Sequence, residues 1–229
     1  MTAVGGRRLA LFDLDNTLLT GDSDALWCDF LIEQGRLDKA TFAAANADME
    51  HRYRAGRATA EEFCSFYVSL LAGISCRDGE SLRQQFLAEW IRPRIGGDAR
   101  ELVAQHRSED DVLILTTATN RFITELTARD LGIAHLIAID VEIVEDTFTG
   151  SSVGVLNMRE GKVTRLAQWL DVQGWPQAMI GEATFYSDSI NDLPLLSAVA
   201  NPVAVDPDLT LAEEARTRGW RTIKFQRKT

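Results

Sequence analysis

The stretch LALFDLDNTLLT, residues 9–20, indicates the fold more strongly than any other part of the sequence. Its first four residues, Leu9 to Phe12, have the composition of a buried strand, and they stop at two aspartates, Asp13 and Asp15. In an open parallel sheet, ligands bind beyond the carboxyl ends of the strands. The stretch therefore predicts a central strand that carries two carboxylates to a binding edge.

Further short apolar runs predict the remaining strands of the sheet. They lie at residues 112–115, 136–139, 184–186, 199–205 and 222–225. From residue 97 onward these runs alternate with helical patterns, in which apolar residues recur at spacings of three and four; the patterns lie at 121–131 and 163–170. Alternation of this kind predicts an α/β fold, a Rossmann-like parallel sheet with helices on both faces.

A long helical insertion separates the first two predicted strands. A strand-helix-strand unit takes roughly 30 residues or somewhat more, whereas residues 14–111 lie between these two strands. Four segments of the insertion have helical patterns, and the first three open with Asp or Thr at an N-cap position and close on glycine. The segments are 24–35, 38–56, 59–73 with a capping box of Thr59 and Glu62, and about 78–91, which ends against Pro93.

These boundaries predict two domains. We expect residues 20–91 to form an inserted helical-bundle cap domain. Residues 1–19 and 92–229 would then form the α/β core that carries the aspartates.

The composition argues against several classes of protein. The 229 residues are 45% hydrophobic, which can fill a core, and their formal net charge is -10. An acidic chain offers no basic field for a phosphate backbone or an anionic membrane, so we expect neither as a partner. No apolar run approaches the roughly 20 residues of a membrane span, and the opening MTAVGGRR is unlike a secretory signal, so we expect a cytoplasmic protein. The sequence gives no indication of the oligomeric state.

Three predicted strands end in side chains that could do chemistry at one edge of the sheet. They are Asp13, Asp15, the polar cluster Thr116–Asn120, Asp188 and Asp192. Transfer of the phosphoryl group from a phosphate monoester needs a nucleophile, a divalent cation and hydrogen-bond donors for the equatorial phosphoryl oxygens. Carboxylates can serve as the nucleophile and as hard oxygen ligands for Mg²⁺, and Lys162 is a candidate for the protein's own cation. The set predicts a Mg²⁺-dependent enzyme whose partner is a small phosphorylated metabolite.

Four parts of the sequence together resemble the motifs of a known family. FDLDNTLL, LILTTATN, Lys162 and YSDSINDLPLL are similar, in this order, to the four motifs of the haloacid dehalogenase (HAD) superfamily of phosphohydrolases. The insertion after the first motif resembles the C1-type cap of subfamily IB, the phosphoserine phosphatase-like branch. The resemblance implies a HAD-like core and phosphatase chemistry through an aspartyl-phosphate intermediate.

The resemblance also implies a role for each matching residue. Asp13 would be the nucleophile, and Asp15 would protonate the leaving oxygen and then activate water. Lys162 would neutralise charge on the nucleophile and the phosphoryl group. Thr117, preferred here over Thr116, would bind a phosphoryl oxygen, with Ala118 beside it in the substrate site. The Mg²⁺ ligands and their supporting residues would be Asp13, Asp15 through its backbone carbonyl, Asp188, Asn191 and Asp192.

The substrate is less narrowly defined. Phosphoserine phosphatases carry a glutamate shortly after the first motif that meets the substrate amine, whereas this chain has Asp22 and Asp24. These two aspartates either bind an amine, as in phosphoserine or histidinol phosphate, or cap the following helix. Two alternatives to hydrolysis stay open. One is a non-enzymatic phospho-receiver or metal-binding signalling module, and the other is a phosphotransferase of the same family.

Overall fold

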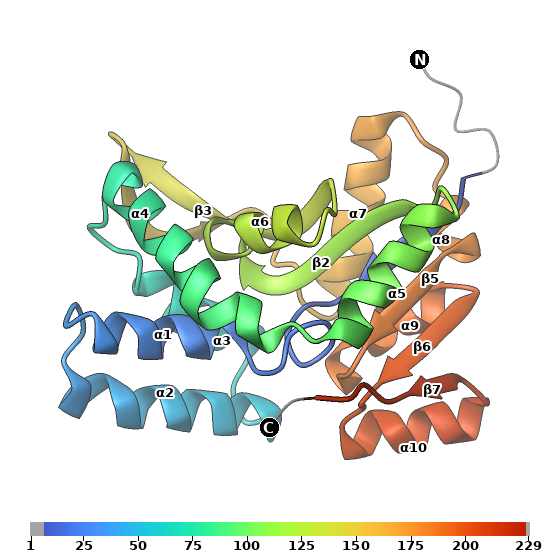
Figure 1. Ribbon diagram of the computed structural model, residues 1–229, viewed down its shortest axis with the longest axis horizontal. Coiled ribbons are helices and arrows are strands. Elements are labelled where there is room, and N and C mark those ends of the chain that lie inside the picture. Colours follow the sequence, from blue (N-terminus) through green and yellow to red (C-terminus); the bar gives the residue numbers. More distant parts are fainter. Residues whose placement is uncertain (1–6, 228–229) are drawn as a thin grey trace.

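The computed structural model describes residues 7–227 of the chain. A seven-stranded sheet lies at its centre in the order β4-β3-β2-β1-β5-β6-β7, with helices packed around it (Figure 1). Neighbouring strands are parallel except β3 and β4, which are antiparallel. The predicted α/β fold is confirmed, and an antiparallel edge strand is added to the predicted parallel sheet.

The strands are β1 (Leu9–Phe12), β2 (Val112–Asn120), β3 (His135–Val144), β4 (Thr147–Val153), β5 (Thr184–Ser187), β6 (Asn201–Val205) and β7 (Arg221–Ile223). The α-helices are α1 (Ser23–Glu33), α2 (Lys39–Arg54), α3 (Ala60–Ser69), α4 (Cys76–Phe86), α5 (Gly97–Ser108), α6 (Arg121–Asp130), α7 (Glu160–Gln173), α8 (Met179–Glu182), α9 (Leu193–Ala198) and α10 (Leu209–Arg218). Shorter helical turns are the π-helix Leu87–Ile91 and the 3₁₀ turns Arg92–Arg94 and Ile190–Asp192.

The central strand β1 divides its side chains between two hydrophobic cores. Leu9 and Leu11 pack in a cluster with residues of α7, α9 and α10, whereas Ala10 and Phe12 belong to the cluster on the other face. All four are buried because β2 and β5 pair with both edges of β1 and helices cover both faces. This arrangement explains the uninterrupted apolar run and places Asp13 at the middle of the sheet's carboxyl edge.

The predicted helical insertion lies between β1 and β2, as α1 to α4. Two of its predicted caps are confirmed. The Asp38 side chain accepts a hydrogen bond from the Thr41 amide at the start of α2, and Thr59 and Glu62 form the capping box of α3. Local sequence therefore determined where these two helices begin.

Two helix boundaries in the insertion differ from the prediction. The N-cap of α1 is Asp22, which accepts hydrogen bonds from the amides of Asp24 and Ala25, so the predicted start at Asp24 is two residues late. The fourth helix begins at Cys76 instead of near residue 78, and its last predicted turns, Leu87–Ile91, are π-helical. A π-helical turn widens the ladder by one residue, which the spacing of apolar residues does not reveal.

Aromatic side chains join the insertion to the core. Trp27 of α1 is fully buried, and its ring lies 5.1 Å from Phe86 of α4 and 5.9 Å from Phe122 of α6. The same hydrophobic cluster contains Phe12 of the central strand. The inserted helices thus pack on the face of the sheet that Phe12 occupies.

Strand β4 has no counterpart among the predicted strands. It follows a tight turn at Glu145 and Asp146, whose φ angles are 47° and 60°, and it pairs antiparallel with β3. Only Phe148 of this strand is buried. A polar edge strand of this kind lacks the apolar run on which strand prediction depends.

The last two strands are shorter than predicted. Strand β6 begins at Asn201 because Val199 ends α9, and β7 ends at Ile223. After β7 the chain leaves the sheet toward the inserted helices (Figure 1).

Candidate active site

Strand β1 ends in a tight turn that presents two carboxylates to one side. The amide of Asp13 donates to the carbonyl of Tyr186 at 2.9 Å, which extends the pairing of β1 with β5 by one residue. Asn16 then adopts the left-handed region, at φ 57°, and two later amides donate to the carbonyl of Leu14. The chain folds back over itself, and Asp13 and Asp15 lie on the same side of the turn.

A buried lysine bridges two of the predicted acids. Lys162, in the first turn of α7, is 2% exposed, and its Nζ lies 2.7 Å from Asp13 Oδ1 and 2.7 Å from Asp192 Oδ2. The Ser187 hydroxyl at the end of β5 donates to the same Asp192 oxygen at 2.7 Å. One positive charge thus connects acids from two different strand ends.

Asp15 is held by neutral donors instead. Its Oδ1 accepts a hydrogen bond from the Ser23 amide at 2.7 Å. Its Oδ2 accepts from the hydroxyls of Thr117 at 3.2 Å and Thr119 at 3.0 Å, both on β2. The two acids of one turn therefore have different surroundings, a cation for Asp13 and hydroxyl and amide groups for Asp15.

The hydroxyl of Thr17 joins the first and last acidic segments. Thr17 Oγ1 lies 3.1 Å from Asp13 Oδ2 and 3.0 Å from Asp188 Oδ1, and it accepts a hydrogen bond from the Asp188 amide at 3.0 Å. Thr17 is fully buried. Asp13 thus turns one oxygen toward Lys162 and the other toward Thr17, on the side of Asp188.

Burial raises the pKa of these carboxyls. The pKa of Asp13 rises to about 7, because the loss of solvent outweighs the attraction of Lys162, and the charge of Asp192 adds to the rise. Burial also raises the pKa of Asp15, and burial with the negative charge of Asp13 raises that of Asp188 well above its usual range. For Lys162, burial lowers the pKa, but the charges of Asp13 and Asp192 raise it further, so the lysine stays protonated.

The donor set fits a divalent cation. Lys162 contacts two of the four acids, Asp13 and Asp192, so the carboxylates of Asp13, Asp15, Asp188 and Asp192 outnumber the cation that pairs with them. The oxygens of Asp13 and Asp188 that face Thr17 are hard ligands of the type that Mg²⁺ prefers. Burial and the charge of Asp13 raise the pKa of Asp188, so a bound cation would favour the ionised form of this carboxyl.

The two acids that follow the turn separate into different environments. Asp22 caps α1. Asp24 is 3% exposed, its Oδ2 lies 3.2 Å from Thr119 Oγ1, and its Oδ1 has no hydrogen-bond partner among residues 7–227. Burial, then the charges of Asp22 and Asp15, raise the pKa of Asp24 well above its usual range. Of the two, the structure brings Asp24 into the hydrogen-bond network of Asp15.

The neighbouring threonines of β2 point to opposite sides. Thr117 Oγ1 lies on Asp15, whereas Thr116 Oγ1 accepts a hydrogen bond from Asn157 Nδ2 at 3.0 Å. The same amide donates to the carbonyl of Thr117 at 2.9 Å. Ala118 packs partly buried against the hydrophobic core. Thr117, and not Thr116, therefore faces the acids.

The sequence-based prediction assigns no individual role to several residues of the site. Thr119 shares the face of Thr117 because side chains alternate along a strand, a signal that the TTATN cluster contains. Asn157 is buried beside β2, where its side-chain amide makes three hydrogen bonds, and the Ser23 amide donates to Asp15. These contacts depend on how separate segments of the chain meet. No local pattern could have identified them.

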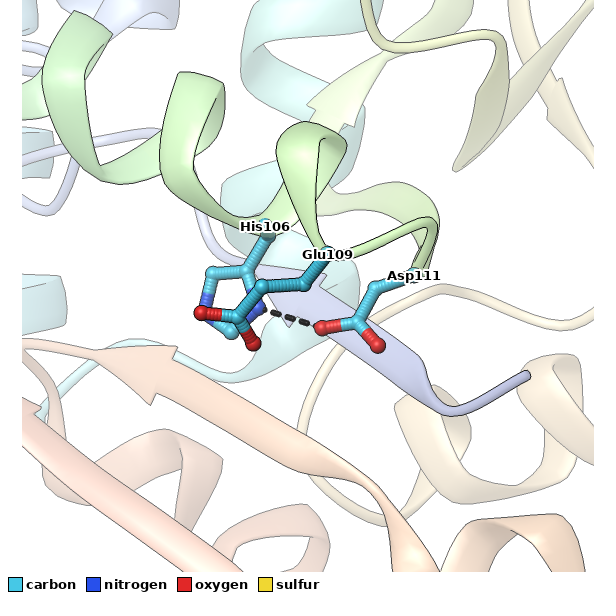
Figure 2. A group of neighbouring side chains, drawn as sticks. All are labelled: His106, Glu109 and Asp111. Atoms are coloured by element: carbon cyan, nitrogen blue, oxygen red, sulfur yellow. Dashed lines mark hydrogen bonds and ion pairs between the residues drawn. The ribbon is translucent and has the colours of Figure 1, made fainter. Parts of the chain in front are cut away.

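A second cluster of possible metal ligands lies at the opposite end of the strands. Ligand atoms of His106, Glu109 and Asp111 lie within 4.8 Å of one another, just before β2 begins (Figure 2). However, His106 is hydrogen-bonded through Nδ1 to Asp111 at 2.7 Å and through Nε2 to the Tyr186 hydroxyl at 2.8 Å. Arg8 pairs with both Glu109 and Asp111. Each of the three side chains thus already has a protein partner, and we build no metal site on this cluster.

None of the helices formed by residues 7–227 combines the length and the apolar character that crossing a bilayer requires.

Comparison with known proteins identifies the family. Residues 10–197, which contain the four motifs and the acids described above, match the haloacid dehalogenase-like hydrolases. The fold and the site define a hydrolase of this type, and the chain belongs to the haloacid dehalogenase-like hydrolase family.

Two relatives with named activities indicate which kind of hydrolase the chain is. A histidinol-phosphatase of Neisseria meningitidis serogroup C (strain 8013) is 38% identical over 221 residues, which span 96% of this chain and 100% of the relative. The phosphoserine phosphatase SerB1 of Mycobacterium tuberculosis (strain ATCC 25618 / H37Rv) is 30% identical over 227 residues, 95% of this chain and 70% of the relative. Within its family the chain is a phosphatase, which confirms the predicted enzyme class and does not support the receiver-module alternative.

Solved structures share the fold. A protein of unknown function from Bordetella pertussis Tohama I is 44% identical, with a TM-score of 0.90, and the match covers 95% of this chain and 98% of that one. A phosphoserine phosphatase solved as a phospho-aspartyl intermediate analogue is 16% identical, with a TM-score of 0.71 and coverage of 97% and 95%. The second match supports the predicted phosphoserine phosphatase-like architecture.

Proposed function

We propose that the protein is a Mg²⁺-dependent phosphatase that hydrolyses a small phosphomonoester through an aspartyl-phosphate on Asp13. One observation carries the proposal: Asp13 contacts the charged Lys162, whereas Asp15, in the same turn, is held by neutral donors alone. Lys162 stabilises an ionised Asp13 for attack, and the surroundings of Asp15 suit a group that carries a proton.

The residues that would hold Mg²⁺ are Asp13, Asp188 and the backbone carbonyl of Asp15, with Asn191 and Asp192 supporting them. When bound, the ion offsets the negative charge of the phosphoryl group and of the nucleophile. Thr17 fixes the separation of the two carboxylates, because its hydroxyl contacts both. Lys162 bridges Asp192 and the nucleophile, and it shares its charge with both acids.

In the first half of the reaction, an Asp13 carboxylate oxygen forms a bond to phosphorus as the bond from phosphorus to the leaving oxygen breaks. Asp15 gives its proton to that oxygen, and the alcohol leaves. The hydroxyl of Thr117 donates to a phosphoryl oxygen once it is released from Asp15. The raised pKa of Asp15 supports the protonated state that this step requires.

In the second half, Asp15 is ionised and accepts a proton from a water molecule. The water oxygen forms a bond to phosphorus, and the bond between phosphorus and Asp13 breaks. Inorganic phosphate leaves, and Asp13 regains its carboxylate. The proton that Asp15 gave to the alcohol is thereby replaced from water, so the cycle balances.

We infer that the substrate carries an amine. Asp24 offers a buried carboxylate oxygen without a partner among the described residues, close to the network of Asp15. An ammonium group would satisfy this oxygen and offset its charge. Phosphoserine and histidinol phosphate both carry such a group, and the relative named histidinol-phosphatase favours histidinol phosphate. Asp22 supports the site by capping the helix that holds Asp24.

The division into a cap, residues 20–91, and a core, residues 1–19 and 92–229, is part of the proposal. The two connections between them pair at one point, where the Thr20 amide donates to the Arg94 carbonyl at 3.0 Å. Burial, and then the negative charge of Asp192, raise the pKa of the Tyr53 hydroxyl in α2, which supports a place for this inserted helix near the site. The inserted helices would thus cover the site and exclude water during transfer.

The test is release of phosphate from p-nitrophenyl phosphate, histidinol phosphate and phosphoserine, with Mg²⁺ and with EDTA. We expect activity that requires Mg²⁺ and is absent from Asp13→Asn. Activity that ignores EDTA would overturn the metal role, and activity in Asp13→Asn would overturn the nucleophile. A parallel assay with glycerol as acceptor separates hydrolysis from phosphotransfer, because transfer would yield less inorganic phosphate than alcohol product.

A further inference from the structure

The segment after β7 reaches back to the turn that carries Asp13 and Asp15. The residue of this segment that contacts the turn is Arg227, and all three nitrogens of its guanidinium donate hydrogen bonds. Nη1 donates to the Leu19 carbonyl at 3.0 Å and the Thr20 hydroxyl at 3.2 Å, and Nη2 donates to the carbonyls of Asn16 and, at 3.1 Å, Thr17. One side chain thus holds four acceptors of residues 16–20.

Two acids anchor this segment along its path. Arg227 Nε donates to Asp206 Oδ2 at 2.8 Å, and the Phe225 amide donates to the same oxygen at 3.3 Å. The Gln226 amide donates to Asp98 Oδ2, near the start of α5, at 2.6 Å. Hydrogen bonds to Asp206 and Asp98 therefore fix residues 225–227 to the core.

The turn needs these contacts because the carbonyls of Asn16, Thr17 and Leu19 accept hydrogen bonds from Arg227. Backbone carbonyls that do not pair within a turn need other donors, and only a guanidinium offers five N–H groups in a planar fork. The Thr17 carbonyl points to Arg227, while the Thr17 hydroxyl contacts Asp13 Oδ2 and Asp188 Oδ1. Arg227 thus binds the backbone of Thr17, whose side chain fixes the distance between Asp13 and Asp188.

We propose that Arg227 is a positioning residue that holds Thr17, and through it Asp13 and Asp188, in the arrangement needed to bind Mg²⁺ and attack phosphorus. The part that concerns Mg²⁺ and turnover rests on the proposed function. The part that concerns the turn does not, because it follows from the hydrogen bonds alone. Substitution of a residue that supports metal ligands without binding the metal typically lowers metal affinity or activity by about 10- to 100-fold.

The experiment compares the wild-type protein with Arg227→Ala, Arg227→Lys and the control Arg216→Ala. Arg216 is an exposed arginine of α10 whose side chain, within the part of the chain that the structure describes, pairs with Glu213 on its own helix and no other residue. Three measurements are made on each protein: amide hydrogen exchange of residues 14–21, calorimetry for the Mg²⁺ dissociation constant, and steady-state kinetics with p-nitrophenyl phosphate for kcat and KM. If Arg227→Ala does not fold, Arg227→Lys takes its place, since lysine keeps the charge but lacks the fork.

We expect Arg227→Ala to exchange faster in residues 14–21, to bind Mg²⁺ about 10- to 100-fold more weakly, and to lose kcat with little change in KM. Low concentrations of guanidinium ion, well below those that denature, should restore part of kcat in Arg227→Ala and none in Arg216→Ala. Arg227→Lys should have a kcat between those of Arg227→Ala and the wild-type protein, because lysine keeps the charge but donates along fewer directions than arginine.

The two proposals fail in different ways. Unchanged exchange of residues 14–21 in Arg227→Ala would overturn the positioning role whatever the enzyme catalyses. Faster exchange with unchanged Mg²⁺ affinity and kcat would also overturn it, since the turn would then not govern the acids. A wild-type protein without Mg²⁺-dependent phosphatase activity would instead overturn the proposed function, and the exchange data would still decide whether Arg227 holds the turn.

Discussion

Lys162 Nζ lies 2.7 Å from Asp13 Oδ1, and both side chains are nearly excluded from solvent. The same nitrogen lies 2.7 Å from Asp192 Oδ2, so the lysine is the shared partner of two buried carboxylates. An unpaired buried charge is costly, whereas a paired one is tolerated. The lysine therefore serves both folding and chemistry, and substitutions that separate these two effects test the account.

Replacing Lys162 with methionine should reduce both stability and activity. Loss of one partner from a buried ion pair costs about 3 to 5 kcal/mol of the free energy of unfolding. Loss of the cation beside the phosphoryl group should lower kcat by about 100-fold or more. Denaturant unfolding and steady-state kinetics measure the two effects. Adding Asp192→Asn to Lys162→Met should recover part of the stability but not kcat, and recovery of kcat would argue against a role for the lysine in transfer.

Replacing Asp15 with asparagine should slow turnover by about 10²- to 10⁴-fold while KM stays similar, because the change removes a proton donor without changing shape. The loss should be smaller for p-nitrophenyl phosphate in the first step, since its leaving oxygen needs little protonation. Rapid-quench kinetics separate the two half-reactions. Equal losses for activated and unactivated substrates in the first step would show that Asp15 does not protonate the leaving group.

Replacing Asp24 with asparagine should affect only substrates that carry an amine. A hydrogen bond to a charged group contributes about 1.5 to 3 kcal/mol, so kcat/KM for histidinol phosphate or phosphoserine should fall by about 10- to 100-fold. The value for p-nitrophenyl phosphate, which has no amine, is the control within the same variant and should hardly change. An equal loss for all three substrates would assign Asp24 to the structure of the site and not to specificity.

The metal-free protein should become less stable as the pH rises. The pKa of Asp13 is raised from 3.8 to about 7 on folding, so the folded state binds this proton more tightly than the unfolded state does. The resulting stability is present in full below the unfolded pKa and is lost as the pH rises through about 7. The melting temperature in EDTA should therefore fall between about pH 5 and about pH 8.

Two controls accompany the pH series. Saturating Mg²⁺ should flatten the decline, because a bound cation compensates the ionised acids. Asp13→Asn should flatten it in part, since Asp188 and Asp24 contribute in the same direction. A melting temperature of the metal-free protein that rises over this range would contradict the raised pKa that burial gives these carboxyls.

The part of the fold that local physics determines could be predicted from the sequence. Strand β1, buried on both faces, shows its burial as an apolar run, and the capping box of Thr59 and Glu62 records the start of α3 directly. Strand β4 could not be predicted in this way, because an edge strand with one buried residue, Phe148, carries no apolar signature. The start of α1 was misplaced because Asp22 and Asp24 are equally good N-caps by residue type, and tertiary burial of Asp24 decides between them.

The candidate site divides in the same manner. Asp13, Asp15, Asp188 and Asp192 follow strands, so the topology of a parallel sheet predicts that they meet. The partners that tune them could not be predicted: Ser23 donates from an inserted helix, and Arg227 approaches from a segment more than 200 residues away in sequence. Their contributions depend on long-range packing, for which a single sequence carries no periodic signal.

The most direct test of the central claim is to find the phosphate on the protein. The enzyme is mixed with substrate and Mg²⁺, quenched in acid within its first turnovers, digested, and analysed by mass spectrometry. The account predicts phosphate on Asp13. With p-nitrophenyl phosphate, whose first step depends little on Asp15, more of it should be trapped in Asp15→Asn, where its hydrolysis is slowed. Turnover that leaves no phosphate on Asp13 in either protein, or that places it on another residue, would contradict the account.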